Sequence, residues 1–185
     1  MPCFGKCPAA EAGARTNRRG GHILVARSRY GQAIAGDELQ FIVFRLGAQE
    51  LALDIFQVVR ILRYAPPARR PGAPAFVGGW LEYDGASVPL IDLRTRFGLP
   101  AEEREETRIM VLDLEGRRIG VVVDLVLEAL RVDTRMIERP DGEIAGVPPG
   151  LVSGVVSRPG RSIAILSSAR LLDPAERQAL AEVRA

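Results

Sequence analysis

The chain has 185 residues, of which 47% are hydrophobic and 26% charged, a composition typical of globular proteins. This length suffices for one sizeable domain or two small lobes, and no apolar run approaches the roughly 20 residues that span a membrane. The net charge is +2, but residues 1–40 hold six basic and three acidic side chains, which leaves the remainder at −1. That balance disfavours a phosphate-binding surface, so we expect no nucleic acid as a partner.

Residues 1–39 form a basic segment rich in Gly, Ala and Arg. We expect it to be a disordered tail, or the product of a start codon assigned too early. Cys3 and Cys7 have the spacing of half a metal site, but His22 is the only histidine, so we expect no metal and no cofactor. The first residues lack the continuous apolar core of a signal peptide, which favours a cytoplasmic protein without direct membrane insertion.

Ordered structure is expected from about Leu39 onward. The segment QFIVFRL alternates as a strand does, and QELALDI reads as the returning strand after a Gly-Ala turn. Asp54 precedes IFQVVRIL, which favours a short helix that leads into a strand. The prolines of residues 65–75 favour an extended surface loop.

The central stretch of the chain is FVGGWLEYDGASVPLIDLRTRFG, residues 76–98. Asp84 and Gly85 predict a type I′ hairpin turn, because both central positions of that turn need a positive φ. The turn joins two apolar strands. Asp92 then predicts an N-cap for a short helix, which Gly98 ends.

The second half of the chain repeats this plan. After the acidic connector AEEREET, the segments TRIMVLDL and RRIGVVVDLVLEALRV predict strands, and LVSGVVSRPGRSIAIL predicts a second hairpin. Residues 76–97 align without gaps on residues 151–172. The alignment superposes Gly79 on Gly154 and Gly85 on Gly160. The repeat predicts two small lobes of short strands that close into barrels.

The last residues, 173–185, predict a C-terminal helix. Asp173 is its N-cap, Pro174 takes the first helical position, and Glu176 completes a capping box. We expect one face of this helix to pack on a barrel, through Ala179, Leu180 and Val183.

Two carboxylates, Asp92 and Asp124, follow apolar strands and are the candidates for catalysis. Structural capping is the favoured interpretation of both, and a small enzyme that uses either of them is the alternative. The chain contains no G-x-S-x-G elbow, no phosphate-binding loop and no dinucleotide fingerprint, which argues modestly against an enzyme.

Over about residues 40–172 the chain resembles the CheW domain of bacterial chemotaxis coupling proteins, in QFIVFRLGAQELALDIFQVVRIL, APAFVGG, GASVPLIDLRTRFG and TRIMVLDLEGRRIGVVVDLV. The resemblance implies a mainly β fold of two SH3-like five-stranded β-barrel lobes, at about residues 40–100 and 107–172. It also implies a non-catalytic adaptor at membrane-associated receptor arrays. Its partners would be a CheA-like histidine kinase and the cytoplasmic tip of a methyl-accepting chemoreceptor.

By the same resemblance, the receptor's helix pair lies along the groove between the lobes, and the kinase contact uses the first lobe near Val58, Arg60, Gly79, Asp84 and Gly85. Family members often carry an acidic residue at position 60 and usually an arginine at position 84, so this chain inverts both charges. We therefore predict that Arg60 and Asp84 face each other as an ion pair. The alternative is two unrelated surface substitutions. The inversion also favours an accessory pathway with its own cognate partners.

Overall fold

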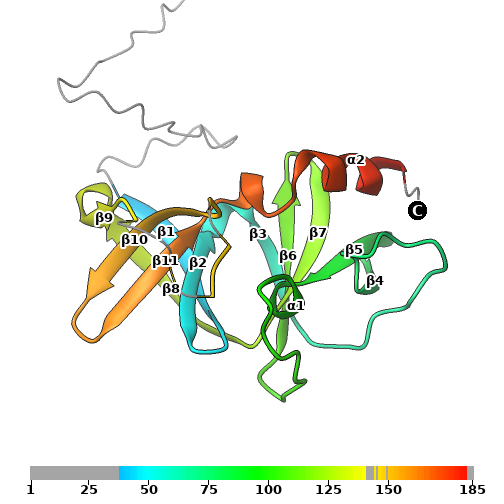
Figure 1. The fold of residues 1–185 in the computed structure, drawn as a ribbon, viewed down its shortest axis with the longest axis horizontal. Coiled ribbons are helices and arrows are strands. Elements are labelled where there is room, and N and C mark those ends of the chain that lie inside the picture. Colours follow the sequence, from blue (N-terminus) through cyan, green and yellow to red (C-terminus); the bar gives the residue numbers. More distant parts are fainter. Residues whose placement is uncertain (1–37, 141–143, 145, 149, 183–185) are drawn as a thin grey trace, which may run out of the picture. The chain divides into compact units, whose positions relative to one another are not determined.

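The structure is a computed structural model that describes residues 38–140, 144, 146–148 and 150–182 (Figure 1). The predicted tail therefore lies outside the described residues, together with Cys3, Cys7 and His22, except that the first strand already begins at Glu38. Within the described ranges, no helix is both long and apolar enough to cross a membrane. The same ranges contain no group of three or more His, Cys, Asp or Glu that could hold a metal ion.

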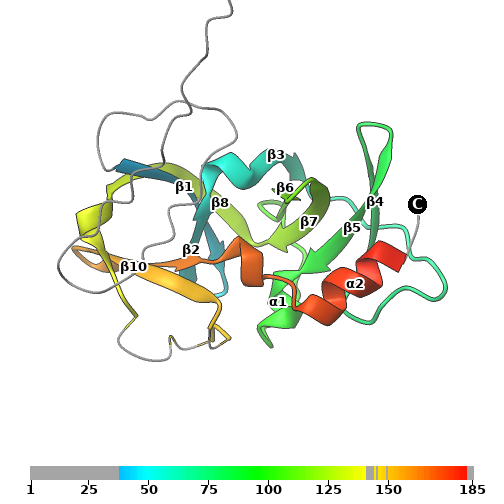
Figure 2. The same ribbon diagram turned by 90° about the horizontal axis from the view of Figure 1, so that it is seen from above.

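Two curled sheets make up the fold (Figures 1 and 2). The six-stranded sheet has the order β8-β1-β2-β11-β10-β9, and the five-stranded sheet has the order β3-β6-β7-β5-β4. The first sheet consists of β1 (Glu38–Leu46), β2 (Gln49–Asp54), β8 (Leu125–Asp133), β9 (Ile137–Glu138), β10 (Val152–Arg158) and β11 (Arg161–Leu166). The second consists of β3 (Val58–Arg63), β4 (Gly79–Tyr83), β5 (Ala86–Asp92), β6 (Arg108–Leu114) and β7 (Arg117–Val123). The predicted mainly β fold is confirmed, with the two-residue β9 as an extra strand in one sheet.

Short helical elements lie between the strands and after the last of them. They are η1 (Ile55–Gln57), α1 (Leu93–Arg96), η2 (Thr134–Met136), η3 (Ser168–Arg170) and α2 (Pro174–Glu182). The short helix expected between Asp54 and the following strand is η1, and the Asp54 carboxylate caps it by accepting a hydrogen bond from the Phe56 backbone N–H at 2.9 Å. The helix predicted after Asp92 is α1.

The two sheets exchange strands along the chain. The early strands β1 and β2 pair with the late strands β8 and β11, whereas β6 and β7 pair with the earlier strands β3 and β5. Each sheet therefore combines the first hairpin of one repeat with later strands of the other, in contrast to the contiguous lobes expected at 40–100 and 107–172. The chain crosses between the sheets after Asp54 and again at Asp124. At the second crossing, the Asp124 carboxylate accepts a hydrogen bond from the Gly47 backbone N–H at 2.7 Å.

The glycines that the repeat superposes perform the same task in both sheets. A Cβ atom on Gly79 would lie 2.5 Å from the Pro67 side chain, and one on Gly154 would lie 2.5 Å from the Ile137 side chain. Their lack of a side chain lets a short segment approach each hairpin closely: Ala68 bridges to Trp80 of β4, and β9 pairs with β10. The repeat is thus a repeat of packing as well as of sequence.

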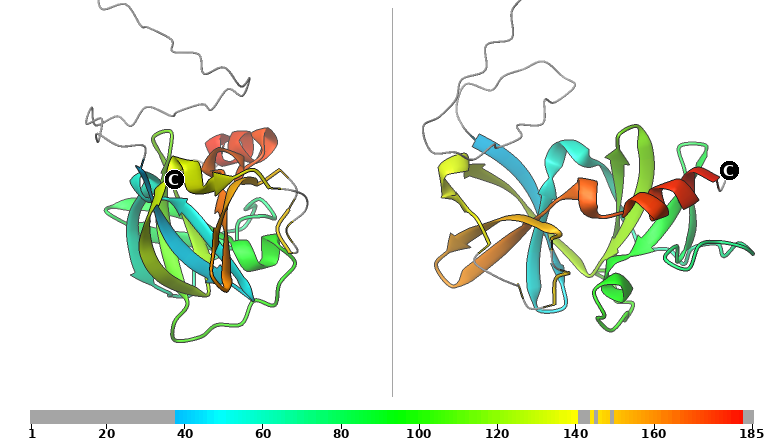
Figure 3. Two further views of the ribbon diagram at one scale, coloured as in Figure 1. Left: turned by 90° about the vertical axis from the view of Figure 1, so that its left-hand side faces the viewer. Right: turned by 45° about the horizontal axis from the view of Figure 1, so that its top comes forward.

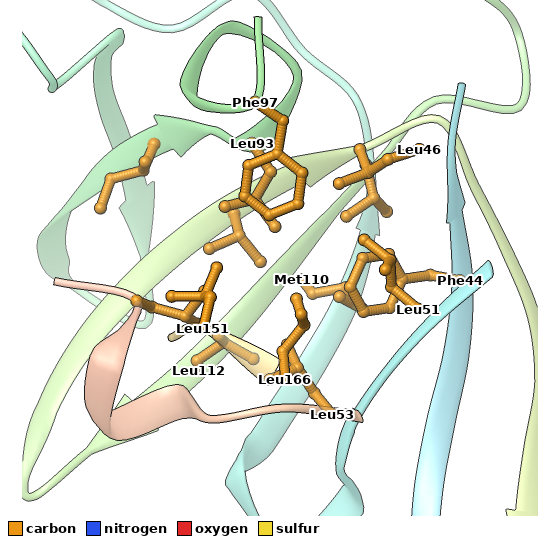
Figure 4. Close-up of a cluster of buried hydrophobic side chains, with 14 of the residues drawn as sticks. Phe44, Leu46, Leu51, Leu53, Leu93, Phe97, Met110, Leu112, Leu151 and Leu166 are labelled. Carbon is orange, nitrogen blue, oxygen red and sulfur yellow. The ribbon is translucent and has the colours of Figure 1, made fainter. Parts of the chain in front are cut away.

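The largest hydrophobic cluster joins the two sheets (Figure 4). It brings together side chains of β1, β2, α1, β6 and β11, among them Phe44, Leu46, Leu51, Leu53, Leu93, Phe97, Met110, Leu112 and Leu166. Two smaller clusters occupy the single sheets, one around Val43 and Ile163 and the other around Leu90, Ile109 and Val122. Each fully buried Leu or Phe contributes about 1.5–3 kcal/mol, so the shared cluster holds the sheets together as one unit.

The helix α2 lies alongside the five-stranded sheet (Figure 3). Its predicted capping box is confirmed: the Glu176 N–H donates to Asp173 Oδ1 at 2.7 Å, and the Asp173 N–H donates to Glu176 Oε2 at 2.9 Å. Leu180 packs against the shared cluster as expected, while Val183 lies outside the described residues. The two Glu176 carboxylate oxygens also accept hydrogen bonds from Arg96, at 2.9 and 2.8 Å.

Candidate functional site

The tip of the β4–β5 hairpin has the predicted geometry. Asp84 and Gly85 have φ values of 54° and 70°, and they form the two-residue turn between the paired residues Tyr83 and Ala86. The Asp84 carboxylate pairs with the Arg118 guanidinium at 2.9 Å, and that guanidinium also lies 5.5 Å from the centre of the Tyr83 ring. An arginine from β7 therefore holds the hairpin tip.

The predicted ion pair between Arg60 and Asp84 is wrong. Arg60 lies on β3, and β3 and β4 are the first and last strands in the order of the five-stranded sheet. Instead, β7 lies next to β5 in parallel, which brings Arg118 from the start of β7 to the hairpin tip. Among the described residues, no ion pair involves Arg60.

A buried arginine brings together the two candidate catalytic carboxylates. Arg94 is only 1% exposed, and its guanidinium donates to both oxygens of Asp92, at 3.0 and 2.8 Å. It also lies 3.5 Å from the Asp124 carboxylate and donates to the Glu102 backbone carbonyl. The hydrogen bond to Asp92 raises the pKa of Arg94 above its usual value. Because Asp124 marks a crossing between the sheets, this cluster ties the five-stranded sheet to the crossing.

The most exposed apolar side chains near the sequence-predicted site lie on η1 and β3. Phe56, Val59 and Ile61 are 63%, 41% and 39% exposed. Arg60 and Arg63 are exposed between and beside them. We call these five residues the β3 stripe. In Figures 1 and 2, β3 lies between the bodies of the two sheets.

The stripe results from local distortions of the chain. The first distortion is η1, which begins with the hydrogen bond from the Phe56 N–H to Asp54. Burial raises the pKa of Asp54 above its usual value, and this hydrogen bond offsets only part of the rise. The register of β3 against β6 then shifts between Val58 and Arg60, so that Val59 is an extra residue without a cross-strand partner. Val58 packs inward against the shared cluster. The apolar residues of this segment thereby divide: Ile55, Val58 and Leu62 pack against the hydrophobic clusters, and Phe56, Val59 and Ile61 face solvent.

Comparison with known proteins identifies the family. Residues 40–176 match the family model of the CheW-like domain. This chain belongs to the CheW-like domain family. It is 29% identical over 141 residues to the chemotaxis protein CheW of Rhizobium meliloti, covering 76% of this chain and 91% of that protein. It is 31% identical over 163 residues to protein FrzA of Myxococcus xanthus, covering 85% and 99%.

The fold agrees with that of a solved CheW structure. The scaffolding protein TtCheW from Thermoanaerobacter tengcongensis superposes with a TM-score of 0.67 at 25% identity, covering 80% of this chain and 94% of that one. Proteins of the CheW-like family are non-catalytic adaptors and scaffolds. The expectation of an SH3-like, non-enzymatic protein is confirmed by this relationship.

The carboxylates of this CheW-like domain have structural partners. Asp92 is the N-cap of α1 and accepts from the Arg94 N–H at 2.9 Å, which confirms the capping interpretation. Asp92 and Asp124 line different cavities and converge only on the Arg94 guanidinium. The alternative of a carboxylate-based enzyme is disfavoured by these partners and by membership of a non-catalytic family.

The sequence-predicted contact residues are spread over both ends of the five-stranded sheet. Val58 and Arg60 lie on β3, whereas Gly79, Asp84 and Gly85 lie on the β4–β5 hairpin. Gly79 is buried and serves packing. Sequence reasoning missed the exposed apolar residues Phe56, Val59 and Ile61. The available signal was the pattern of IFQVVRIL, in which three pairs of adjacent apolar residues replace the alternation expected of a strand with one buried face.

Proposed function

We propose that this protein is an adaptor that couples chemoreceptors to a CheA-like histidine kinase in a chemotaxis or chemosensory-like pathway. Its place of action would be the cytoplasm, at membrane-associated receptor arrays. The observation that carries the proposal is an exposed apolar and cationic surface, the β3 stripe, on a domain of the CheW-like family. Contiguous exposed apolar side chains with a polar border are typical of protein–protein contact sites.

The stripe is the favoured kinase contact. It includes Arg60 and adjoins Val58, two of the residues at which the family resemblance implies that contact. The hairpin tip at Asp84 and Gly85 would form a second contact on the same sheet. Since Arg118 holds the tip in position, the tip would meet its partner without a large loss of conformational entropy.

The receptor contact would lie on the surface above the junction of the sheets. Large apolar side chains from both sheets fill the interior of that junction. A pair of receptor helices would consequently pack on the outer surface of the junction, because its interior is already filled.

Reconstitution of the signalling complex tests the proposal. The full chain, the CheA-like kinase of the same genome and a receptor cytoplasmic fragment are combined, and kinase autophosphorylation is measured. We expect the receptor fragment to alter kinase activity only when this protein is present. Equal receptor control of the kinase without this protein would contradict the proposal.

A further inference from the structure

The β3 stripe is cationic as well as apolar. Arg60 and Arg63 are exposed, and within the described part of the chain neither forms an ion pair. The residue opposite Arg63 on β6 is another arginine, Arg108, which donates to the backbone carbonyls of Glu105 and Thr107. Positive charge therefore accumulates along β3 without compensation from this chain.

The carboxylates that flank β3 along the chain and at its end are engaged elsewhere. Asp54 accepts the Phe56 backbone N–H at the start of η1. Glu103 accepts a hydrogen bond from the hydroxyl of Tyr64, the residue after β3, at 2.9 Å. Both groups therefore have partners of their own, and Arg60 and Arg63 are free to meet charges from another molecule.

We propose that the kinase partner presents an acidic and apolar surface to this stripe. Its apolar side chains would cover Phe56, Val59 and Ile61, while its carboxylates would pair with Arg60 and Arg63. The inference rests on the proposed function and adds the charge of the partner's surface. Desolvation at an apolar contact strengthens such pairs, and a partner with basic groups at these positions would be rejected.

Salt dependence separates the two parts of the contact. Binding of the full chain to the isolated regulatory domain of the CheA-like kinase is measured by calorimetry at low and high NaCl. Screening by salt weakens contacts between charges and leaves apolar contacts largely intact. We expect Arg60→Glu and Arg63→Glu each to reduce the low-salt affinity by about tenfold or more, and to flatten its salt dependence.

Two control variants accompany the charge reversals. Arg158→Glu reverses another exposed arginine, at the end of β10 in the other sheet, and we expect it to keep the wild-type affinity. Ile61→Ala shortens an apolar side chain of the stripe, and we expect it to weaken binding while retaining the salt dependence. A carboxylate-to-lysine change on the kinase should restore binding of Arg60→Glu.

The outcomes are distinguishable. If the wild-type chain binds the kinase domain and the two reversals match Arg158→Glu, the proposed function stands and the acidic partner surface is refuted. If the wild-type chain binds neither kinase nor receptor, the proposed function falls and the inference with it. Binding to vesicles of anionic lipid that is abolished by Arg60→Glu, with unchanged kinase affinity, would assign the arginines to a membrane and overturn the inference.

Discussion

The strands β3 and β8 occupy equivalent edges of the two sheets, yet their surfaces differ. β8 pairs along its length with β1, and its nine residues include no large exposed apolar side chain. Both of its carboxylates are paired, Glu128 with Arg161 at 2.9 Å and Asp133 with Arg135, whereas Arg131 forms no ion pair among the described residues. β3 instead exposes Val59 and Ile61 beside two arginines without ion pairs among the described residues.

The two halves of the repeat therefore differ in the exposed side chains of their edge strands, β3 and β8. The repeat builds two similar sheets with the same glycine packing and the same hairpins, and these features need no partner. Edge strands risk unwanted pairing, which proteins limit with charges and bulges. β3 has both a bulge and arginines, which limit unwanted strand pairing at an edge that exposes apolar side chains.

The largest expected loss of stability comes from the Arg94 cluster, at the point where the chain crosses between the two sheets. Replacing Arg94 by Ala leaves the carboxylates of Asp92 and Asp124 without their buried counter-charge. We expect the free energy of unfolding, measured in urea, to fall by about 3 kcal/mol. Arg104→Ala removes an exposed partner of Glu102 and should leave the free energy of unfolding almost unchanged, because solvent screens this pair. Equal effects of the two substitutions would show that the junction does not depend on Arg94.

Alanine at the two equivalent glycines compares the sheets directly. At Gly79 a methyl group would clash with Pro67 and lie 3.0 Å from the Ala68 backbone oxygen, at a φ of +155°. At Gly154 it meets mainly the Ile137 side chain, which can move. We expect Gly79→Ala to lower the free energy of unfolding by about 2–3 kcal/mol and Gly154→Ala by about 1 kcal/mol. The opposite order would mean that the two sheets pack differently from the structure.

The capping box of α2 begins the helix that lies alongside the five-stranded sheet. Asp173→Ala removes the acceptor of the Glu176 N–H and should cost about 0.5–2 kcal/mol in chemical denaturation. Asp173→Asn keeps an acceptor oxygen and should retain most of this stability. A wild-type stability in the alanine variant would indicate that α2 adds little to the fold.

The smallest expected effect concerns the end of β8. The hydrogen bond from Arg135 lowers the pKa of Asp133 from 3.8 to about 2, so the ionised carboxylate favours the folded state. Its contribution is complete above the unfolded pKa and disappears as pH falls toward 2. Asp133→Asn should therefore be slightly less stable than wild type at neutral pH and equal to it near pH 2, in urea titrations across pH. A difference that persists near pH 2 would have another origin.

Local features of the fold were predictable from the sequence, because neighbouring residues determine them. The turn at Asp84 and Gly85, the cap at Asp92 and the capping box at Asp173 are of this kind. Strand exchange was not predictable, because both repeats have the same apolar pattern and either partner satisfies it. The same limit explains the failed pairing of Arg60 with Asp84, whose actual partner Arg118 arrives through a parallel contact between distant strands.

Exposure at the candidate site was equally out of reach. Whether Val59 and Ile61 are buried depends on the register of β3 and on what covers the faces of its sheet, and both arise only in the folded structure. The bulge at Val59 depends on the register with β6, a strand that begins 45 residues after Arg63. The unusual charge at position 60 could indicate that β3 belongs to the candidate site, but it could not predict which apolar side chains around Arg60 are exposed.

The most direct test of the account places a carboxylate on each of the two equivalent edges. Ile61→Asp changes β3, and Ala129→Asp changes an exposed position of β8. The affinity of each full-length variant for the regulatory domain of the CheA-like kinase is measured beside wild type. We predict that Ile61→Asp weakens binding by about tenfold or more and that Ala129→Asp binds as wild type does. Unchanged binding by Ile61→Asp, or an equal loss in both variants, would contradict the assignment of the partner surface to β3.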